Sequence, residues 1–183
     1  MLRPLVLRAL VALLATANAL HAQNTTVIVV RHAEKAAAPA ADPPLTAAGE
    51  ARAAALVDLV KDAGISAIIS TNYLRTRATV APLAARLGLT VQIVNAALPQ
   101  HPRLVADSVL ANYRGKTVLI SGHSNTVPAI VAALGAPKPA DICDDGYDNV
   151  FIVTIPASGA PTVVRLHFGA ATTCAVKDAT MKE

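Results

Sequence analysis

The sequence predicts an α/β fold, a three-layer α/β/α sandwich with a mostly parallel sheet. Short runs of β-branched residues alternate with longer stretches rich in Ala and Leu. Four such strand–helix units follow one another, and two further strands close the chain. Strands that alternate with helices in this way usually form a parallel sheet with helices on both faces.

The expected elements follow from apolar runs and from residues that begin or end helices. Four strands are expected at residues 26–30, 66–70, 91–94 and 117–120. The first two are apolar enough for burial on both faces of the sheet. The first helix is expected from Thr46 to Gly64, and the second follows the strand at residues 66–70 and runs through Leu83 to Gly88. The third and fourth helices are expected at residues 104–113 and 126–134. Residues 149–155 and 162–168 are expected to pair as a hairpin.

The chain of 183 residues fits one folded domain, expected at residues 23–183, behind a leader at residues 1–22. Apolar residues make up 54% of it and aromatic residues only 3%. Single-stranded nucleic acids are bound largely by stacking on aromatic side chains, so we expect no nucleic-acid partner. Basic residues are scattered, which also argues against a face that binds polyanions.

The first residues have the pattern of a secretory signal peptide. Arg3 and Arg8 precede an uncharged apolar stretch, and small residues follow at Ala19 and Ala22. Cleavage after Ala22 is expected, with Ala19 as the alternative, and the product would be periplasmic or secreted. An uncleaved membrane anchor is the other interpretation, but the apolar run at residues 10–20 is short for a bilayer.

Cys143 and Cys174 are the only cysteines of the chain. In an exported protein an even pair usually forms a disulfide, so this bond is predicted, with two buried free thiols as the alternative. Their spacing is not that of metal ligands, and only His167 lies near them in the sequence. We therefore expect neither a metal nor a cofactor.

Polar residues follow four of the expected strands where each strand ends. They are Arg31-His32-Ala33-Glu34, residues 71–77 with Arg75 and Arg77, residues 95–107, and Gly122-His123-Ser124-Asn125. Carboxyl ends of parallel strands meet at one sheet edge, where ligands bind. Arginine forks and a helix N-terminus at Asn125 suit a phosphate, and a neutral imidazole can attack phosphorus.

These residues resemble the motifs of the histidine phosphatase superfamily, also called phosphoglycerate-mutase-like. Arg31-His32-Ala33-Glu34 is similar to its Arg-His-Gly-Glu signature, with Ala33 in place of Gly. Leu45-Thr46 with Gly49 resembles its Leu-Thr-x-x-Gly helix start, and residues 70–85 resemble its arginine-bearing helix. Gly122-His123 resembles its second-histidine element. The four elements occur in the family's order over nearly the whole mature chain.

The resemblance implies a phosphoglycerate-mutase-like fold and a role for each matching residue. His32 would be the phosphorylated nucleophile, and Arg31 and Arg75 would clamp the transferring phosphoryl group. His123 would donate a hydrogen bond to it, and Ser124 and Asn125 would help to bind substrate. Arg77 lies two positions beyond Arg75 on the expected helix and is expected to point elsewhere.

The chain departs from the family at the general acid. Many relatives carry a carboxylate after the third strand or just after the second histidine, whereas residues 95–106 contain no Asp or Glu and Ser124 follows His123. Asp107 is expected to be a solvated helix residue. Glu34 stays a candidate acid because the motif fixes it beside the site. A substrate with a good leaving group, such as a phosphoramidate, would need less help.

The remaining polar residues have simpler interpretations. The aspartates at 141, 144, 145 and 148 fail the EF-hand spacing and are expected to form a polar turn. His101 is expected in an exposed loop and His167 in a structural position. The sequence thus predicts a metal-independent phosphatase acting on a small phosphorylated substrate through a phosphohistidine. The alternative is a non-catalytic phosphate-binding protein, and mutase activity is not expected because no insertion could form a lid.

Overall fold

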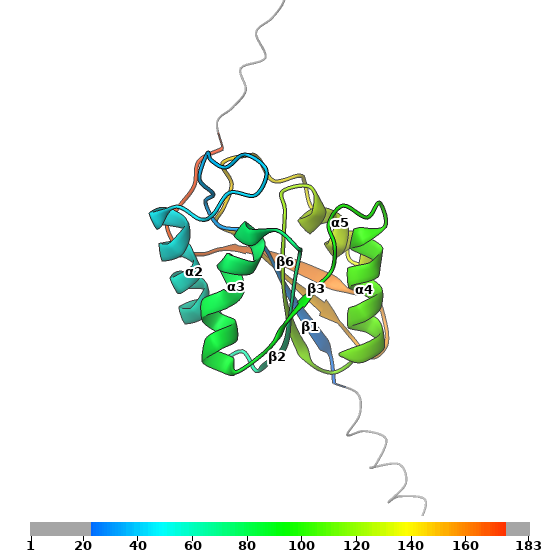
Figure 1. Ribbon diagram of the computed structural model, residues 1–183. Helices are drawn as coiled ribbons and strands as arrows, with labels where there is room; N and C mark the ends of the chain where they lie inside the picture. Colours follow the sequence, from blue (N-terminus) through cyan, green and yellow to red (C-terminus); the bar gives the residue numbers. More distant parts are fainter. Residues whose placement is uncertain (1–22, 175–183) are drawn as a thin grey trace, which may run out of the picture.

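The computed structural model describes residues 23–174, which form one sheet between two pairs of helices (Figure 1). The strands are β1 (Thr25–Arg31), β2 (Ile65–Ser70), β3 (Val91–Ile93), β4 (Thr117–Gly122), β5 (Asn149–Ile155) and β6 (Thr162–His167). The helices are α2 (Ala47–Val60), α3 (Leu74–Leu87), α4 (His101–Asn112) and α5 (Thr126–Ala133). The predicted signal peptide at residues 1–22 lies outside the described part of the chain.

The sheet is mostly parallel, as predicted. Its strand order is β3-β2-β4-β1-β5-β6. The first four strands pair in parallel, whereas β5 is antiparallel to β1 and β6 is antiparallel to β5. The carboxyl ends of β1, β2 and β4 therefore meet at the centre of one edge. The segments that follow them carry the predicted site residues.

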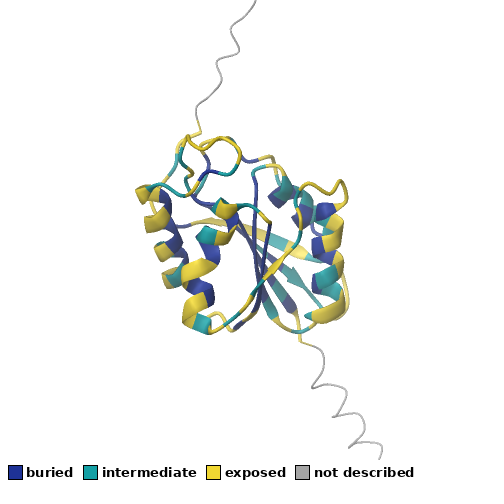
Figure 2. Cartoon of the chain, viewed as in Figure 1, coloured by how far each residue is buried: buried dark blue, intermediate teal, exposed yellow. Residues whose placement is uncertain are grey.

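Two apolar cores fill the spaces on the two sides of the sheet. Side chains alternate along β1, so that Val27 and Val29 pack toward α4 and α5 while Ile28 and Val30 pack toward α2 and α3. All four are at most 5% exposed. The central strands are buried between helices whose outer surfaces are exposed (Figure 2), which confirms the three-layer arrangement.

Helix boundaries mostly follow the predicted signals. Thr46 caps α2 by accepting a hydrogen bond from the backbone N–H of Gly49 at 3.2 Å, and α3 ends at Gly88 with a φ of 64°. Two ends were predicted wrongly. Helix α2 ends at Val60, four residues before Gly64, and α4 begins at His101 rather than at residue 104.

The Cys143–Cys174 disulfide is formed, which agrees with the prediction and leaves no free cysteine among residues 23–174. It joins the loop before β5 to the segment after β6. Within residues 23–174 no helix is both long and apolar enough to span a bilayer.

Candidate active site

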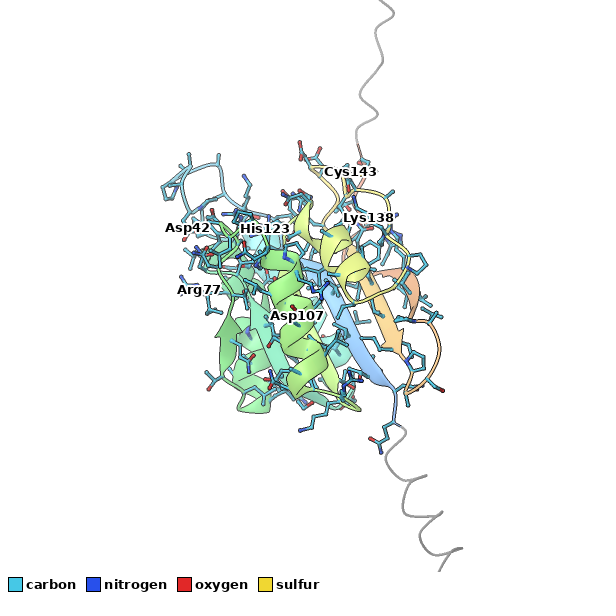
Figure 3. The ribbon with its side chains drawn as sticks, turned by 90° about the vertical axis from the view of Figure 1, so that its right-hand side faces the viewer. Asp42, Arg77, Asp107, His123, Lys138 and Cys143 are labelled. Atoms are coloured by element: carbon cyan, nitrogen blue, oxygen red, sulfur yellow. A yellow bond between two sulfur atoms is a disulfide. The ribbon has the colours of Figure 1, made fainter. Side chains whose placement is uncertain are left out.

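A pocket of about 380 Å³ opens at the carboxyl ends of β1 and β4. It is lined by Arg31, His32, Lys35, Tyr73, Arg75, Ala96, His123, Ser124, Asn125, Thr126 and Asp144. Six of these residues were singled out in the sequence, from three segments far apart in the chain. Figure 3 shows His123 and Asp42 at this end of the molecule.

His32 is held in one tautomer by its own loop. Its side chain is almost fully buried, and Nδ1 lies 2.8 Å from the carbonyl oxygen of Ala33. A carbonyl can only accept, so Nδ1 carries the proton and Nε2 keeps its lone pair. Burial lowers the pKa of His32 to about 3, with the charges of Arg31 and His123 acting in the same direction. The imidazole is therefore neutral and nucleophilic at neutral pH.

The ring of His123 stands edge-on to His32, with 5.4 Å between the ring centroids. Its Nε2 is 3.2 Å from the hydroxyl of Thr71, which is 2.7 Å from the hydroxyl of Thr76. Thr76 donates to the carbonyl of Tyr73 at 2.8 Å, so Thr71 donates to Thr76 and accepts from His123 Nε2. This chain leaves Nδ1 of His123 free to exchange a proton with a ligand.

Burial also lowers the pKa of His123, to about 4, and the charge of Arg75 contributes to the shift. Without a ligand, His123 is thus neutral at neutral pH. A bound phosphate dianion would reverse this balance, because a negative charge nearby favours the imidazolium form. His123 can then donate Nδ1–H to the anion.

Both predicted arginines present a buried donor that no residue among 23–174 satisfies. The Nε of Arg31 and the Nε of Arg75 are buried without a hydrogen-bond partner in this part of the chain. Arg75 stacks on Tyr73, with its guanidinium carbon 4.3 Å from the centre of the ring. Its Nη1 lies 3.7 Å from Oδ1 of Asp42. Unsatisfied buried donors are costly, so an oxyanion that accepts from both arginines fits the site.

The N-terminus of α5 completes the pocket. The hydroxyl of Thr126 accepts from the backbone N–H of His123 at 2.8 Å, which turns the chain from β4 into the helix. Ser124 and Asn125, both predicted to bind substrate, line the pocket at this turn. Helix N-termini offer free N–H groups and a partial positive charge to an anion.

Glu34 has a different role from the acid considered in the sequence. Its carboxylate accepts from Arg52 Nε at 2.9 Å and from Arg52 Nη2 at 2.8 Å. Burial alone would raise the pKa of Glu34, but the hydrogen bonds and charge of Arg52 outweigh it and lower the pKa. Glu34 does not line the pocket. An ionised, fork-bonded carboxylate is a poor proton donor, so its candidacy as general acid is corrected.

Two charged residues lie on exposed helix surfaces, as expected (Figure 3). Asp107 on α4 pairs with Arg103 at 2.9 Å, and Arg77 lies on α3. His101 was predicted wrongly: it begins α4 and turns inward, so that it is only 2% exposed. His167 pairs with Asp148 at 3.1 Å. Over residues 23–174 no group of three or more His, Cys, Asp or Glu side chains is arranged to bind a metal.

Tyr73, Tyr147, Thr71, Asp144 and Lys35 belong to the site or contact its residues and were not nominated from the sequence. Tyr73 and Tyr147 stack on Arg75 and Arg31, Thr71 orients His123, and Asp144 lines the pocket. In a chain with only three tyrosines, the two beside strand ends were a usable signal. Asp144 was interpreted as part of a polar turn, and only the fold brings that turn to the pocket.

These features define the class of protein: an α/β/α sandwich with a histidine and arginine pocket for an oxyanion at the carboxyl edge of its sheet. The profile of the histidine phosphatase superfamily (branch 1) matches residues 27–97. This segment contains His32, Arg31 and Arg75. Over this segment the chain is similar to the histidine phosphatase superfamily.

Several solved structures share the fold. The protein histidine phosphatase SixA complexed with tungstate is 22% identical, with a TM-score of 0.64 over 78% of this chain and 96% of that one. Mycobacterial glucosyl-3-phosphoglycerate phosphatase is 16% identical, with a TM-score of 0.59 over 72% and 91%. Phosphoserine phosphatase from Entamoeba histolytica is 16% identical, with a TM-score of 0.58 over 80% and 98%. No curated protein matches the chain.

Proposed function

We propose that this protein is a metal-independent phosphatase that hydrolyses a phosphomonoester or phosphoramidate through a phosphohistidine intermediate on His32. The observation that carries the proposal is the pairing of a neutral, tautomer-fixed imidazole with two arginines whose buried Nε donors lack a partner among residues 23–174. A nucleophile and an anion clamp in one pocket suit phosphoryl transfer.

In the first step, Nε2 of His32 attacks phosphorus and forms the P–N bond. The bond from phosphorus to the leaving group breaks, and the leaving group departs with the electron pair. Arg31 and Arg75 neutralise the charge on the equatorial oxygens, which is the main electrostatic demand of this reaction. The carbonyl of Ala33, 2.8 Å from Nδ1, stabilises the positive charge that the substituted ring acquires.

In the second step, water attacks the phosphohistidine and breaks the P–N bond. Inorganic phosphate is released and His32 recovers its lone pair on Nε2, while the water proton passes to phosphate or solvent. His123 lies opposite His32 and can donate Nδ1–H to the phosphoryl oxygens in both steps. The pocket is open at the sheet edge, so water reaches the intermediate.

The range of substrates is narrowed by the positions of the two acids that were nominated in the sequence. Glu34 is bound by Arg52 and Asp107 faces solvent, so neither can protonate a leaving group. Substrates whose leaving group needs little protonation, such as a phosphohistidine or an aryl phosphate, are favoured. The similarity to the protein histidine phosphatase SixA supports a phosphohistidine as the first substrate to test.

A second candidate is a binding protein that retains the pocket without turnover. The observation in its favour is that neither Glu34 nor Asp107, the two acids considered in the sequence, lines the pocket. A binding protein, however, does not need His32 with a free Nε2 facing the anion clamp.

We also propose that the protein is exported and acts as the mature chain from Gln23. The signal-like pattern of residues 1–22 and the Cys143–Cys174 disulfide both support this proposal.

The test is phosphate release from aryl, alkyl and phosphohistidine substrates by the wild type and by His32→Asn. Asn is close in size to His and keeps a group at the position of Nδ1. We expect the variant to lose on the order of 10⁴-fold or more in kcat while still binding tungstate. Rapid quenching with a radiolabelled substrate should trap an acid-labile label on the wild type alone. Turnover that survives in His32→Asn would refute the mechanism, and no turnover on any substrate would favour the binding protein.

A further inference from the structure

The side chain of Arg31 is held by a loop more than 110 positions away in the sequence. Its Nη1 donates to the carbonyl oxygen of Cys143 at 2.7 Å and to that of Gly146 at 3.3 Å. Its guanidinium carbon lies 4.3 Å from the centre of the Tyr147 ring. One nitrogen and one face of the guanidinium are therefore occupied before any ligand binds.

This loop, residues 143–148, is itself tied to the chain end after β6. The Cys143–Cys174 disulfide joins the two covalently. Thr172 donates its hydroxyl to Asp148 at 2.6 Å and its backbone N–H to Asp148 at 3.2 Å, and its oxygen accepts from the backbone N–H of Tyr147 at 3.2 Å. We call residues 143–148 the Arg31 support loop.

The support loop decides which donors of Arg31 face the pocket. With Nη1 bound to two carbonyls, Nε and Nη2 are left, and Nε is buried with no partner among residues 23–174. Nε and Nη2 form one edge of the guanidinium, the edge that binds two oxygens of a phosphate side by side. An arginine already fixed in this orientation loses less conformational freedom when the anion binds.

We propose that the Arg31 support loop is the positioning device of the phosphate clamp, and that the Cys143–Cys174 disulfide couples the clamp to the redox state of its surroundings. The proposal deepens the proposed function, since it assumes that Arg31 binds the phosphoryl group. The reduced protein keeps its nucleophile but binds oxyanions more weakly, because the support loop then loses its covalent link to the segment after β6 and keeps only non-covalent contacts such as the Thr172 hydrogen bonds.

The first test compares the oxidised wild type with the double variant Cys143→Ala/Cys174→Ala. The Kd for tungstate should rise about tenfold in the variant, the size expected when an oriented, partly buried arginine contact is loosened. Treatment of the wild type with a dithiol should have the same effect. The dithiol passes two electrons and two protons to the disulfide, giving two cysteine thiols, and becomes a cyclic disulfide.

A double-mutant cycle separates positioning from general stabilisation. In an Arg31→Ala background the loop has no guanidinium to hold, so removal of the disulfide should leave the tungstate Kd unchanged within about twofold. An equal loss of affinity in both backgrounds would overturn the proposal. So would a disulfide-free protein that loses thermal stability but binds tungstate as the wild type does.

Tyr147 provides a second test that keeps the disulfide intact. Tyr147→Leu removes the ring from the Arg31 face and should weaken tungstate binding several-fold, whereas Tyr147→Phe keeps a ring and should restore most of the affinity. Equal affinities of the two variants would contradict the positioning role. Tungstate binding is measured without turnover, so these results stand apart from whether the protein proves to be a phosphatase.

Discussion

The source of the leaving-group proton is a question about single side chains. Glu34 is an ionised partner of Arg52, and Asp107 is paired with Arg103 on the outer face of α4. Asp144 is the one aspartate or glutamate among the residues that line the pocket. Burial lowers the pKa of His123 to about 4, so it is neutral at neutral pH without a ligand, and a bound anion would favour its protonated form. Among the described residues that line the pocket, Asp144 and His123 are therefore the two candidate donors.

We expect kcat/KM of the wild type to depend steeply on leaving-group pKa, because Glu34 is held by Arg52 and Asp107 pairs with Arg103 away from the pocket. Aryl phosphates and phosphoramidates should react far faster than alkyl phosphates. A leaving-group series measures this, with Asp144→Asn beside the wild type and Asp107→Asn as the control. A flat series that becomes steep in Asp144→Asn would identify Asp144 as the acid. A flat series in both would point to His123.

At the scale of elements, α2 and the loop after β1 are packed so closely that only glycine fits between them. A Cβ at Gly49 would lie 2.3 Å from the carbonyl oxygen of Glu34. The same loop carries His32, and the backbone N–H of Ala33 donates to Thr79 of α3 at 2.8 Å. The position of His32 thus depends on the start of α2 and on α3.

Gly49→Ala should therefore displace the loop that carries His32. We expect a loss of about 1–3 kcal/mol in the free energy of unfolding, typical of overpacking, together with a fall in kcat/KM. Chemical denaturation and steady-state kinetics measure the two effects. Ala48→Gly, on the exposed side of the same turn, is the control: it should cost about 1 kcal/mol in stability through helix propensity and leave kcat/KM unchanged. Normal activity in Gly49→Ala would refute the coupling.

The Glu34–Arg52 pair links the loop after β1 to α2, and Arg52 also contacts the segment after β6. Arg52 is 3% exposed and also donates to the carbonyls of Phe168 and Ala170, at 2.7 and 2.8 Å. Glu34→Gln leaves this buried cation without its counter-charge, and we expect a loss of about 1–3 kcal/mol in the free energy of unfolding. Asp107→Asn, which breaks an exposed pair, should cost less than about 0.5 kcal/mol. Equal losses in the two variants, measured by urea unfolding, would be inconsistent with the structural role of Glu34.

At the scale of the whole molecule, burial of two neutral histidines makes folding sensitive to acid. The pKa of His32 falls to about 3 and that of His123 to about 4, from 6.5 in the unfolded chain. Between the folded and unfolded pKa values, the unfolded chain binds more protons than the folded one. The contribution of the histidines to the free energy of unfolding is therefore complete above pH 6.5 and is lost as the pH falls toward 4 and then 3. Each histidine contributes a slope of up to about 1.4 kcal/mol per pH unit.

We expect urea unfolding between pH 6.5 and 4.5 to show this loss and the double variant His32→Asn/His123→Asn to show a shallower slope. Glu34 and Asp148 also have lowered pKa values, but their ordinary values of 4.5 and 3.8 place their effect below this window. An unchanged slope in the double variant would mean that the histidines are not buried in the neutral form.

Export is tested on the mature protein itself. Intact mass spectrometry of material from an exporting host should give a chain that begins at Gln23, and the non-reduced protein should be lighter by two hydrogens than the reduced one. A chain that retains residues 1–22 would contradict cleavage, and two free thiols would contradict the disulfide in the exported form.

The sequence by itself determined the elements and the main reactive residues. All six strands were predicted, and continuous apolar runs mark β1, β2 and β4, which are buried between the two helical layers. Helix ends with a capping residue, Thr46 and Gly88, were located correctly, whereas the ends of α2 and α4 were misplaced where the signal was weaker. His32, Arg31, Arg75 and His123 could be nominated because each follows a strand at the edge where parallel strands converge.

The tertiary structure alone decided how these side chains are used. Glu34 is next to the site residues in the sequence and Asp144 is far from them, yet Glu34 is bound by Arg52 and Asp144 lines the pocket. His101 is buried although it was expected in an exposed loop. The contact of Arg31 with the support loop spans more than 110 positions. Local sequence patterns report burial and backbone preference, whereas partner, tautomer and pKa depend on groups that only the folded chain brings within a few ångströms.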